Sequence, residues 1–391
     1  MARRPLARAG LAALALVLGC APAARVPVAP PALVPAPEVQ RLVDPRPVPT
    51  GPSWLGGDVA SSVAVGDGRW IWIFGDTLLG NVRADCPGGA SYCDRVVDER
   101  PDRTMIANSV GVMTRGPDGA LRPLEKHWRT VAGMPAPLFE AAAPGELLWP
   151  LAVAEVDGVL LIAASRHTRA AGLRSLGSVL VRVEHPGAPP DRWGYTRHPL
   201  PGDVVDPERE PLLWSTALVP EGAHVYVVGR RGDGPASRTV LARLRAADVR
   251  RADWRPAPEY LLDAPDGGAP VWSRDLDPAR LHVVEGLPGT SEAALVCVRR
   301  RGCWTYRIAP LDDAIHLYTA PRLTGPWRDR GVAYEIPGLG ETYSAYAAKE
   351  HPELGGAVSY NVNVANGSLA EAVRAAEEWP AFYVPRMLAP P

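Results

Sequence analysis

The chain has 391 residues, of which 42 are basic and 43 acidic, so its formal net charge at pH 7 is −1. This balance argues against a nucleic-acid-binding protein, because such proteins carry basic patches that neutralise phosphates. Only Lys126 and Lys349 are lysines among the basic residues, a bias that we interpret as high-GC coding without a functional message.

The first 50 residues predict a targeting signal followed by a stalk. Three arginines precede the apolar run 11–18, which is too short to span a bilayer and is followed by Gly19-Cys20. This pattern resembles a bacterial lipoprotein signal, in which cleavage leaves Cys20 to be lipidated; a plain secretory signal is the alternative. Residues 21–50 contain nine prolines and predict an extended stalk. We therefore expect a signal peptide at 1–20, a stalk at 21–50 and a folded domain at 51–391, lipid-anchored in the bacterial cell envelope or secreted.

A β-hairpin with an acidic residue on each strand follows the stalk. Apolar runs flank the turn Gly66-Asp67-Gly68, and Asp58 and Asp76 each lie nine residues from Asp67. The hairpin places these two acids opposite each other at its open end, where like charges destabilise a strand pair. A shared proton, a bound cation or catalysis would explain such a pair. Two independent strand-end acids that point into water are the alternative.

The remaining cysteines form two close pairs, Cys86 with Cys93 and Cys297 with Cys303. Four cysteines allow three connectivities, and the local one is favoured because each bond would then close a single loop outside the cell. A zinc site is the alternative, but no Cys-x2-Cys or neighbouring histidine spacing supports it.

Tryptophans recur along the rest of the chain at spacings of 65, 61 and 73 residues, at Trp128, Trp193, Trp254 and Trp327. Each follows an apolar strand, and earlier in each unit lies another strand pair, such as Leu147–Glu155 with Val159–Ala164. Four strands in about 65 residues are typical of a propeller blade, and the chain has room for five such units. We therefore predict an all-β, five-bladed β-propeller. A pair of β-sandwiches would explain the strands but not the tryptophan spacing.

One short helix is expected to interrupt this pattern near the C-terminus. Ser368-Leu369-Ala370-Glu371 is a capping box, and the helix should continue to about Trp379 and end at Pro380. The segment 382–387 is then expected to form the closing strand.

Several motifs resemble known glycosidases. The segment Leu323-Thr324-Gly325-Pro326-Trp327 is similar to an outer-strand element of five-bladed glycoside hydrolase propellers. The hairpin with Gly57-Asp58 and Phe74-Gly75-Asp76-Thr77 resembles an uncharacterised-domain family of that superfamily that includes endo-D-arabinanases, and so do segments 358–363 and 383–386. The resemblance covers about residues 50–388 and implies a five-bladed propeller and, by analogy only, a calcium ion on its axis.

Glycoside hydrolysis needs one carboxylic acid to protonate the leaving oxygen and one carboxylate to attack the sugar or activate water. Asp58 and Asp76 can supply this pair if their proximity separates their pKa values. We expect Asp58 to be the general base or nucleophile, and Asp76 the general acid or the residue that tunes its partner. A third acid is typical of the wider superfamily; Glu292 and Glu341 are the candidates, and a place on the rim is the alternative for each.

Sugar binding needs aromatic faces and planar hydrogen-bonding groups. For the tryptophans among the candidates, packing between blades is the alternative. Asn361 and Asn363 lie two residues apart and so share one strand face, with capping of a turn as their alternative. The candidates for substrate binding are Asn108, Trp149, Trp214, Tyr343, Tyr360, Asn361, Asn363 and Arg386.

These observations predict a monomeric glycosidase that acts on a furanose-containing, arabinan-like polysaccharide and needs no cofactor. The main alternative is a non-catalytic carbohydrate-binding propeller, and a third possibility is a scaffold for envelope proteins. The expected partners are a polysaccharide or oligosaccharide and, through the lipid anchor, the membrane.

Overall fold

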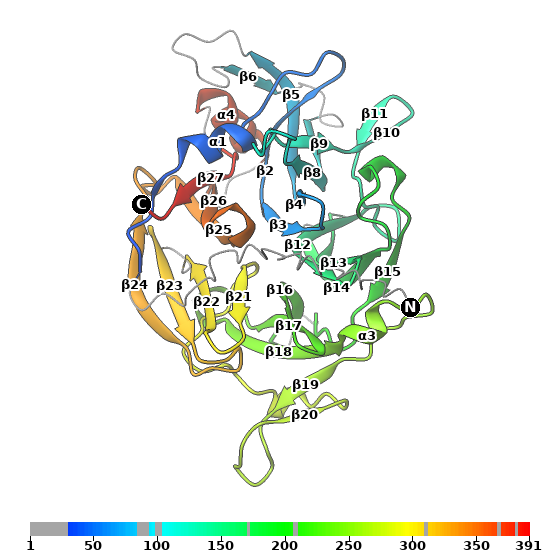
Figure 1. Cartoon of the computed structure of the whole chain (residues 1–391), viewed down its shortest axis with the longest axis vertical. Helices are drawn as coiled ribbons and strands as arrows, with labels where there is room; N and C mark the ends of the chain where they lie inside the picture. The colour runs from blue at the N-terminus through cyan, green and yellow to red at the C-terminus, as the bar shows by residue number, and fades with distance from the viewer. Residues whose placement is uncertain are drawn as a thin grey trace, which may run out of the picture.

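The computed structural model describes residues 30–83, 94–97, 104–169, 173–205, 210–308, 312–365, 369–379 and 382–391. Most of the regular structure in this part of the chain is β-strand. The strands form antiparallel sheets that are arranged radially around a central axis (Figure 1). This is the arrangement of a β-propeller, and it confirms the all-β propeller class that the strand pattern predicted.

Each radial sheet is ordered from the axis outward, and most consist of strands that are consecutive in the chain. The first contains β3 (Ser61–Ala64), β4 (Arg69–Phe74), β8 (Ser109–Thr114) and β9 (Glu125–His127). The second contains β12 (Glu146–Val156), β13 (Val159–Thr168), β14 (Arg174–Val183) and β15 (Tyr195–Pro199). The third contains β16 (Leu212–Glu221), β17 (His224–Arg231), β18 (Arg238–Arg245), β19 (Glu259–Leu262) and β20 (Val271–Ser273). The fourth contains β21 (Leu295–Val298), β22 (Gly302–Arg307), β23 (Ala314–Ala320) and β24 (Arg328–Glu335).

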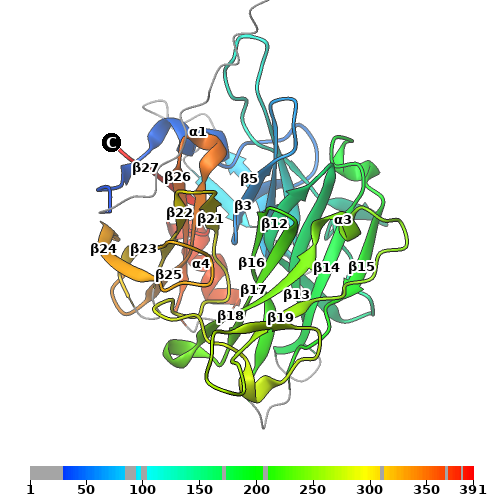
Figure 2. The same ribbon diagram turned by 60° about the horizontal axis from the view of Figure 1, so that its bottom comes forward.

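The next sheet combines the two ends of the described chain. It contains β25 (Tyr343–His351), β26 (Ala357–Val364) and β27 (Arg386–Ala389), and its outermost strand is β1 (Val34–Pro35). The innermost strands meet around the axis, because β3 contacts β12, β12 contacts β16, β16 contacts β21, β21 contacts β25, and β25 contacts β3. Figure 2 shows these sheets side by side from a second direction. The two cavities described below lie along the axis between these inner strands.

The remaining described elements are an additional sheet, a short strand pair and several helices. A further sheet is formed by β2 (Ser53–Gly57), β5 (Thr77–Arg83), β6 (Asp94–Val97) and β7 (Met105–Ile106), and β10 (Arg129–Val131) pairs with β11 (Met134–Ala136). The α-helices of the described residues are α1 (Pro37–Val43), α3 (Ala246–Val249) and α4 (Leu369–Glu378). Short 3-10 helices are η2 (Pro190–Arg192), η3 (Gly234–Ala236), η4 (Pro278–Arg280) and η5 (Pro352–Leu354). In the described residues, no helix has the length and apolar character needed to cross a bilayer.

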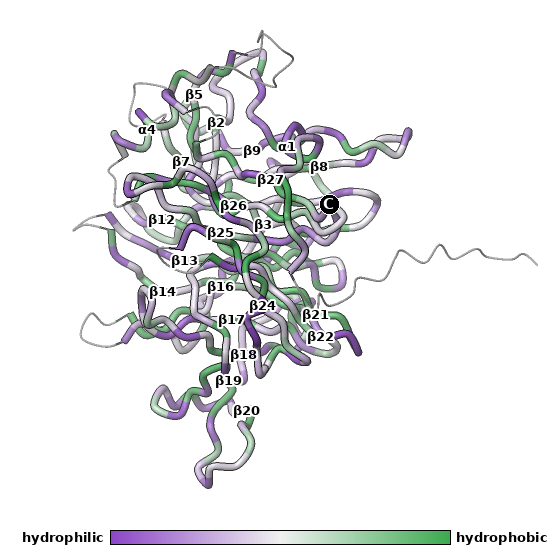
Figure 3. The backbone as a smooth tube through the Cα atoms, turned by 90° about the vertical axis from the view of Figure 1, so that its left-hand side faces the viewer, coloured by the Kyte–Doolittle hydropathy of each residue, from purple (hydrophilic) through white to green (hydrophobic). Residues whose placement is uncertain are grey.

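The hydrophobic core is divided among the seams between neighbouring sheets. Strands in this position are covered on both faces, and Leu160, Leu161 and Ile162 of β13 are accordingly all fully buried. Figure 3 shows that apolar backbone segments concentrate in the strands and polar ones in the loops. The recurrent tryptophans lie beside the outer strands: Trp193, Trp254 and Trp327 precede β15, β19 and β24, and Trp128 follows β9. They pack into these seams, as the spacing argument required.

The predicted stalk does not hold for its last part, because residues 33–44 pack on the propeller. Strand β1 pairs with β27, and the carboxamide of Gln40 in α1 bonds to the backbone of Pro385 and Met387 at 3.1 and 2.9 Å. Val43 is fully buried, and the ammonium of Lys126 donates to the carbonyls of Val43 and Asp44, both at 2.8 Å. The prolines before the helix limited the sequence-based prediction to composition, whereas Val43 and the Gln40 carboxamide dock the helix on the propeller.

The C-terminal elements agree in part with prediction. Helix α4 ends at Glu378, close to the expected Trp379, while Ser368 of the capping box lies outside the described residues. The closing strand β27 begins at Arg386, so the preceding residues Phe382–Pro385 are not strand as expected. They instead turn the Tyr383 side chain toward the axis.

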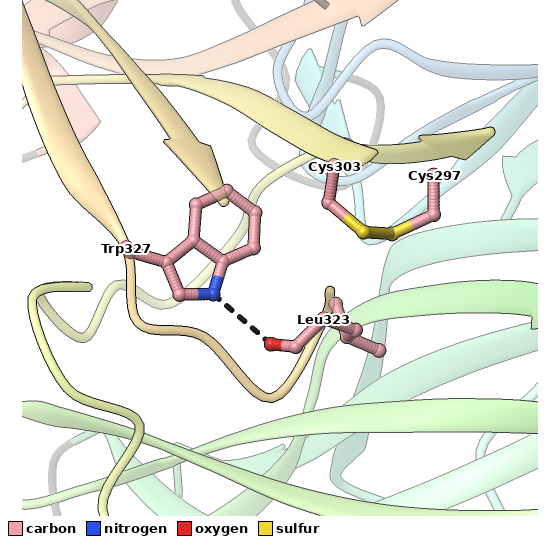
Figure 4. The surroundings of a disulfide bond; sticks show 4 residues. All are labelled: Cys297, Cys303, Leu323 and Trp327. Carbon is pink, nitrogen blue, oxygen red and sulfur yellow. Dashed lines mark hydrogen bonds between the residues drawn. A yellow bond between two sulfur atoms is a disulfide. The ribbon is translucent and has the colours of Figure 1, made fainter. Parts of the chain in front are cut away.

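The disulfide between Cys297 and Cys303 is formed, which confirms the local pairing for this pair. It joins directly opposed residues of β21 and β22, close to the hydrogen bond from the Trp327 indole to the Leu323 carbonyl (Figure 4). Cys20, Cys86 and Cys93 lie outside the described residues, so the lipidation and the second disulfide stay predictions.

Candidate functional site

A pocket with a volume of about 680 Å³ opens at one end of the propeller axis. Its size is within the range of small-molecule and oligosaccharide sites. Its wall comes from residues in or just before each of the innermost strands, together with the end of the β4 strand and the loop before β27. The lining includes Asp58, Asp76, Trp149, Ser165, His167, Arg169, Ser215, Arg230, Glu292, Tyr346, Asn363 and Tyr383.

Asp58 and Asp76 face each other across the predicted hairpin. The register of β3 with β4 pairs Ser61 with Ile73, and its continuation pairs Asp58 with Asp76. Their backbones are bonded accordingly, with the Asp58 amide donating to the Asp76 carbonyl at 3.2 Å. The turn at residues 66–68 has positive φ at all three positions, which the two glycines accommodate. The hairpin and the opposition of its two acids are therefore confirmed.

The backbone is kinked immediately after Asp58. Val59 and Ala60 have φ values of 70° and 47°, a left-handed conformation that is rare for a β-branched residue. The kink separates β2 from β3, and the Ala60 amide closes it by donating to the Asp58 carbonyl at 2.8 Å. At this point, beside the pocket, the pairing of β2 with β5 ends and the pairing of β3 with β4 begins. Strain of this kind is concentrated at functional sites in proteins.

The carboxylate of Asp58 has very different surroundings on its two oxygens. Oδ2 accepts hydrogen bonds from the hydroxyls of Tyr346 and Tyr383 at 3.3 and 3.2 Å. Oδ1 is buried and has no hydrogen-bond partner among the described residues. Burial raises the pKa of Asp58 well above its ordinary value, and the charges of Asp76 and Glu292 raise it further, against the lowering by the two tyrosines. The structure thus favours a protonated Asp58.

The carboxylate of Asp76 is better supported in its ionised form. The indole of Trp149 donates to Oδ1 at 2.8 Å, and the guanidinium of Arg169 lies 3.9 Å from Oδ2. Burial raises the pKa of Asp76 to about 6, while Arg169 and the Trp149 bond act in the opposite direction. The two opposed acids therefore differ in environment, which is the condition for one to donate a proton and the other to accept one.

Glu292, one of the two candidates for a third acid, lies in the same pocket. It is almost completely buried, and the ammonium of Lys349 lies 3.4 Å from its Oε2. Burial raises the pKa of Glu292, and the charge of Lys349 counteracts this effect. Glu341, the other candidate, is exposed in the turn before β25 and does not line the pocket.

Of the predicted sugar-binding residues, only Trp149 and Asn363 line the pocket. Trp214 is fully buried and its indole donates to the Gly202 carbonyl at 3.1 Å. Tyr343 packs on Trp379, Tyr360 is buried beside Tyr334, and the Arg386 guanidinium lies 4.3 Å from the Trp379 ring centre. These four side chains make packing contacts and do not line the pocket.

Two of the predicted asparagines have structural positions next to the site. Asn108 is fully buried and its amide bonds to the carbonyls of Phe139 and Leu148, both at 2.9 Å, which fixes the strand that carries Trp149. Asn361 donates to the Gly57 carbonyl at 3.1 Å, directly before Asp58. Both therefore hold the backbone of pocket residues and do not line the pocket themselves.

Sequence reasoning missed Tyr346, Lys349 and Arg169. Tyr383 was expected in the closing strand and in a motif of the resembled family, but not as a residue of the site. Tyr346 and Lys349 lie three residues apart in β25, a spacing that puts side chains on opposite faces of a regular strand. The rarity of lysine was the available signal: the ammonium groups of both lysines in this arginine-rich chain donate to backbone carbonyls.

Comparisons with known proteins agree with this architecture. Residues 50–385 match a family described as "Domain of unknown function (DUF5005)". No curated protein matches the sequence. A crystal structure described as a "putative hydrolase from Bacteroides ovatus ATCC 8483" has 15% identity and a TM-score of 0.67, with 91% of this chain and 89% of that chain covered.

More distant structures include enzymes. The catalytic domain of the Coprinopsis cinerea GH62 α-L-arabinofuranosidase has 8% identity and a TM-score of 0.41, with 92% of this chain and 93% of that chain covered. RS223-β-xylosidase has 14% identity and a TM-score of 0.42, with 88% and 94% covered. The likeness to the Bacteroides structure shows that the fold is shared.

Proposed function

Since this chain belongs to the DUF5005 family of domains of unknown function, we propose a function from its own site: glycoside hydrolysis through the pair Asp58 and Asp76. The observation that carries this proposal is the opposition of two partly buried carboxyls with different surroundings on the wall of an axial pocket of about 680 Å³. Like charges at directly opposed strand positions destabilise a fold. Their burial together is explained if the pair performs acid–base chemistry.

The hydrogen bonds support one order of roles. Asp58 holds the proton, because burial and the charges of Asp76 and Glu292 raise its pKa, and it donates that proton to the glycosidic oxygen as the bond to the anomeric carbon breaks. Asp76, held by Trp149, is the carboxylate that attacks the anomeric carbon or removes a proton from the attacking water. This order is the reverse of the one that the sequence predicted.

The substrate class that we propose is a furanose-containing, arabinan-like polysaccharide. Its support is the resemblance of the double-aspartate hairpin to the family that includes endo-D-arabinanases. The radial sheets fit a propeller of five blades, one for each inner strand around the axis. We further propose that Cys20 anchors the protein in the bacterial envelope, where such polymers are accessible.

The proposal sets the pH dependence of activity. Asp76 must be ionised, so activity should increase as pH rises through about 6, the pKa to which burial raises this group. Asp58 must be protonated, so activity should fall again at higher pH, when the raised pKa of Asp58 is passed. The pH–rate profile is expected to be bell-shaped.

The test is release of reducing ends by the full-length protein from arabinans, arabinogalactans and other furanose polymers. Asp58→Asn and Asp76→Asn should each lower the rate by about 10²–10⁴-fold, the usual contribution of a general acid or base. Glu341→Gln is the control, because Glu341 is exposed outside the pocket, and it should retain wild-type activity.

Two results would overturn the proposal. Release that both aspartate variants retain would show that another group performs the chemistry. Binding of a polymer by wild type and both variants, with no release by any of them, would instead identify a carbohydrate-binding propeller.

A further inference from the structure

Lys349 is the most deeply buried cationic side chain near the site. Its side chain is inaccessible to solvent, although lysine is rarely buried without compensation. Its ammonium donates to Ser61 Oγ at 2.7 Å and to the Leu151 carbonyl at 2.6 Å, and it lies 3.4 Å from Glu292 Oε2. An ammonium group has three N–H donors: two of them are hydrogen-bonded to Ser61 and Leu151, and the ammonium forms an ion pair with Glu292.

The partners of Lys349 place its ammonium on the propeller axis. Lys349 belongs to β25, Ser61 to β3 and Leu151 to β12, while Glu292 precedes β21. These elements come from four different sheets around the axis. A single atom within 3.4 Å of groups from the three other sheets must lie between their inner strands.

Lys349 also separates two cavities. The candidate site contains Leu151 and Glu292, whereas a second cavity of about 320 Å³ is lined by Ser61, Lys349 and residues of every inner strand. The ammonium thus lies between the site and the opposite end of the axis.

A calcium ion on the axis, expected by analogy, does not fit these residues. Calcium takes six to eight oxygen ligands, usually several of them carboxylates. Here one carboxylate, one carbonyl and one hydroxyl converge, and each already faces the Lys349 ammonium. Within the described part of the chain, no group of three or more His, Cys, Asp or Glu residues could hold a metal ion.

We propose that the Lys349 ammonium is the built-in axial cation of this protein: it ties the inner strands together and balances Glu292 below the aspartate pair, in place of a metal ion. The choice of residue fits this role, because the lysine ammonium is compact, whereas the broader guanidinium of arginine prefers planar, bidentate partners. Lysine at this position is notable in a chain where only one other basic residue is a lysine.

The proposal makes Lys349 a positioning residue and does not depend on glycosidase activity. Its immediate consequence is structural: without Lys349, the Glu292 carboxylate would be buried without a counter-ion. Breaking one side of a buried ion pair is much more costly than replacing both sides. The loss caused by removing Lys349 should therefore be repaired, in part, by making residue 292 neutral.

The experiment is thermal unfolding of the full-length protein and its variants, with calcium and with EDTA. Wild type should show the same Tm in both conditions. Lys349→Met should lower the Tm by about 5–10 °C, and the double variant Lys349→Met/Glu292→Gln should recover at least half of that loss. Glu292→Gln alone removes the acidic side of the pair, so it should also lower the Tm, but by less than Lys349→Met, because the new amide oxygen can still accept a hydrogen bond from Lys349.

Specific results would overturn the inference. A wild-type Tm that falls in EDTA and returns with calcium would show an axial metal. A double variant no more stable than Lys349→Met would show that Lys349 does not balance Glu292. If Lys349→Met fails to fold, the same question is decided by recovery of folded protein when Glu292→Gln is added, since recovery supports the pairing and its absence contradicts it.

Discussion

The position of the Asp58 carboxylate depends on a residue that has no side chain. A Cβ atom added at Gly75 would lie 2.4 Å from Asp58 Oδ1 and 3.0 Å from a methyl group of Val59. Gly75 also donates its amide to the Asp58 carbonyl at 3.2 Å, so the backbones cannot separate without loss of this bond. Only glycine therefore leaves the carboxylate where the two tyrosines hold it.

We predict that Gly75→Ala displaces the Asp58 carboxylate and lowers kcat by about 10²-fold, the effect of a misplacement of about 1 Å. The measurement is kcat and KM on the polymer that wild type cleaves. Gly194→Ala is the control, because a Cβ there meets no atom within 4 Å. Equal kinetics for the two variants would contradict the assigned role of Asp58.

At neutral pH, the protein with Asp76 should have a lower free energy of unfolding than a variant with an asparagine at this position. Its pKa is raised by burial from 3.8 to about 6, so the folded state holds the proton more tightly than the unfolded state. The ionised Asp76 therefore lowers the free energy of unfolding. This loss is absent below pH 4, grows as pH rises from 3.8 to about 6, and is complete above pH 6. A shift of about two units corresponds to about 3 kcal/mol.

We therefore predict that Asp76→Asn increases the free energy of unfolding by about 2–3 kcal/mol at pH 8 but not at pH 4. Urea unfolding at both values measures this difference. The exposed Asp67→Asn serves as control. An Asp76→Asn effect of the same size at both pH values would show that the carboxylate's charge is not its cause.

At the scale of elements, a bulge in β25 brings Tyr346 and Lys349 onto one face. The register pairs Tyr346 with Asn361 but Lys349 with Ser359, so β25 contains one extra residue between them. Ala347 takes up this residue with a φ of 58°. Without the bulge, one of the two side chains would point away from the axis.

We predict that Ala347→Gly is neutral or stabilises the protein by up to about 1 kcal/mol, because glycine adopts this conformation without strain. Ala348→Gly is the matched control: it is equally buried but lies in regular strand, and it should cost about 1–2 kcal/mol through lost methyl burial and backbone entropy. Chemical denaturation of both variants decides this, and an equal loss in both would mean that β25 is not bulged at Ala347.

The same bulge explains which parts of the site the sequence could predict. The Asp58–Asp76 hairpin was predictable because turn residues and strand periodicity fix its register. The strands and the recurrent tryptophans were predictable from apolar runs. Tyr346 and Lys349 were not, since a one-residue bulge reverses the facing of every later side chain and leaves no mark in the composition. Tyr383 was missed because its role depends on a turn where a strand was expected.

At the scale of the whole molecule, the N-terminal segment completes the last sheet of the propeller from the end opposite the site. Strand β25 runs from the site toward the second cavity, and β26, β27 and β1 alternate in direction. The described chain therefore enters β1 from the end opposite the site.

This closure also determines where the domain begins. Helix α1 and the residues after it join β27 of the last sheet to Leu124 and Lys126 of the first, through bonds of 2.8 to 3.1 Å. Burial lowers the pKa of Lys126 to about 7, so its charged form is stabilised mainly by the hydrogen bonds to the carbonyls of Val43 and Asp44. The segment thus belongs to the fold and not to a tether.

We predict that a protein beginning at residue 45 is less stable than one beginning at residue 30 by about 3–6 kcal/mol, because it loses the buried side chains of Leu33 and Val43 and the partners of Lys126. The Tm should fall by about 10 °C. Calorimetry of the two proteins measures this difference, and Val34→Ser in the longer protein is a control, since Val34 is 41% exposed. If both proteins unfold at the same temperature, residues 30–44 do not close the propeller, and the domain starts where the proline-rich composition first suggested.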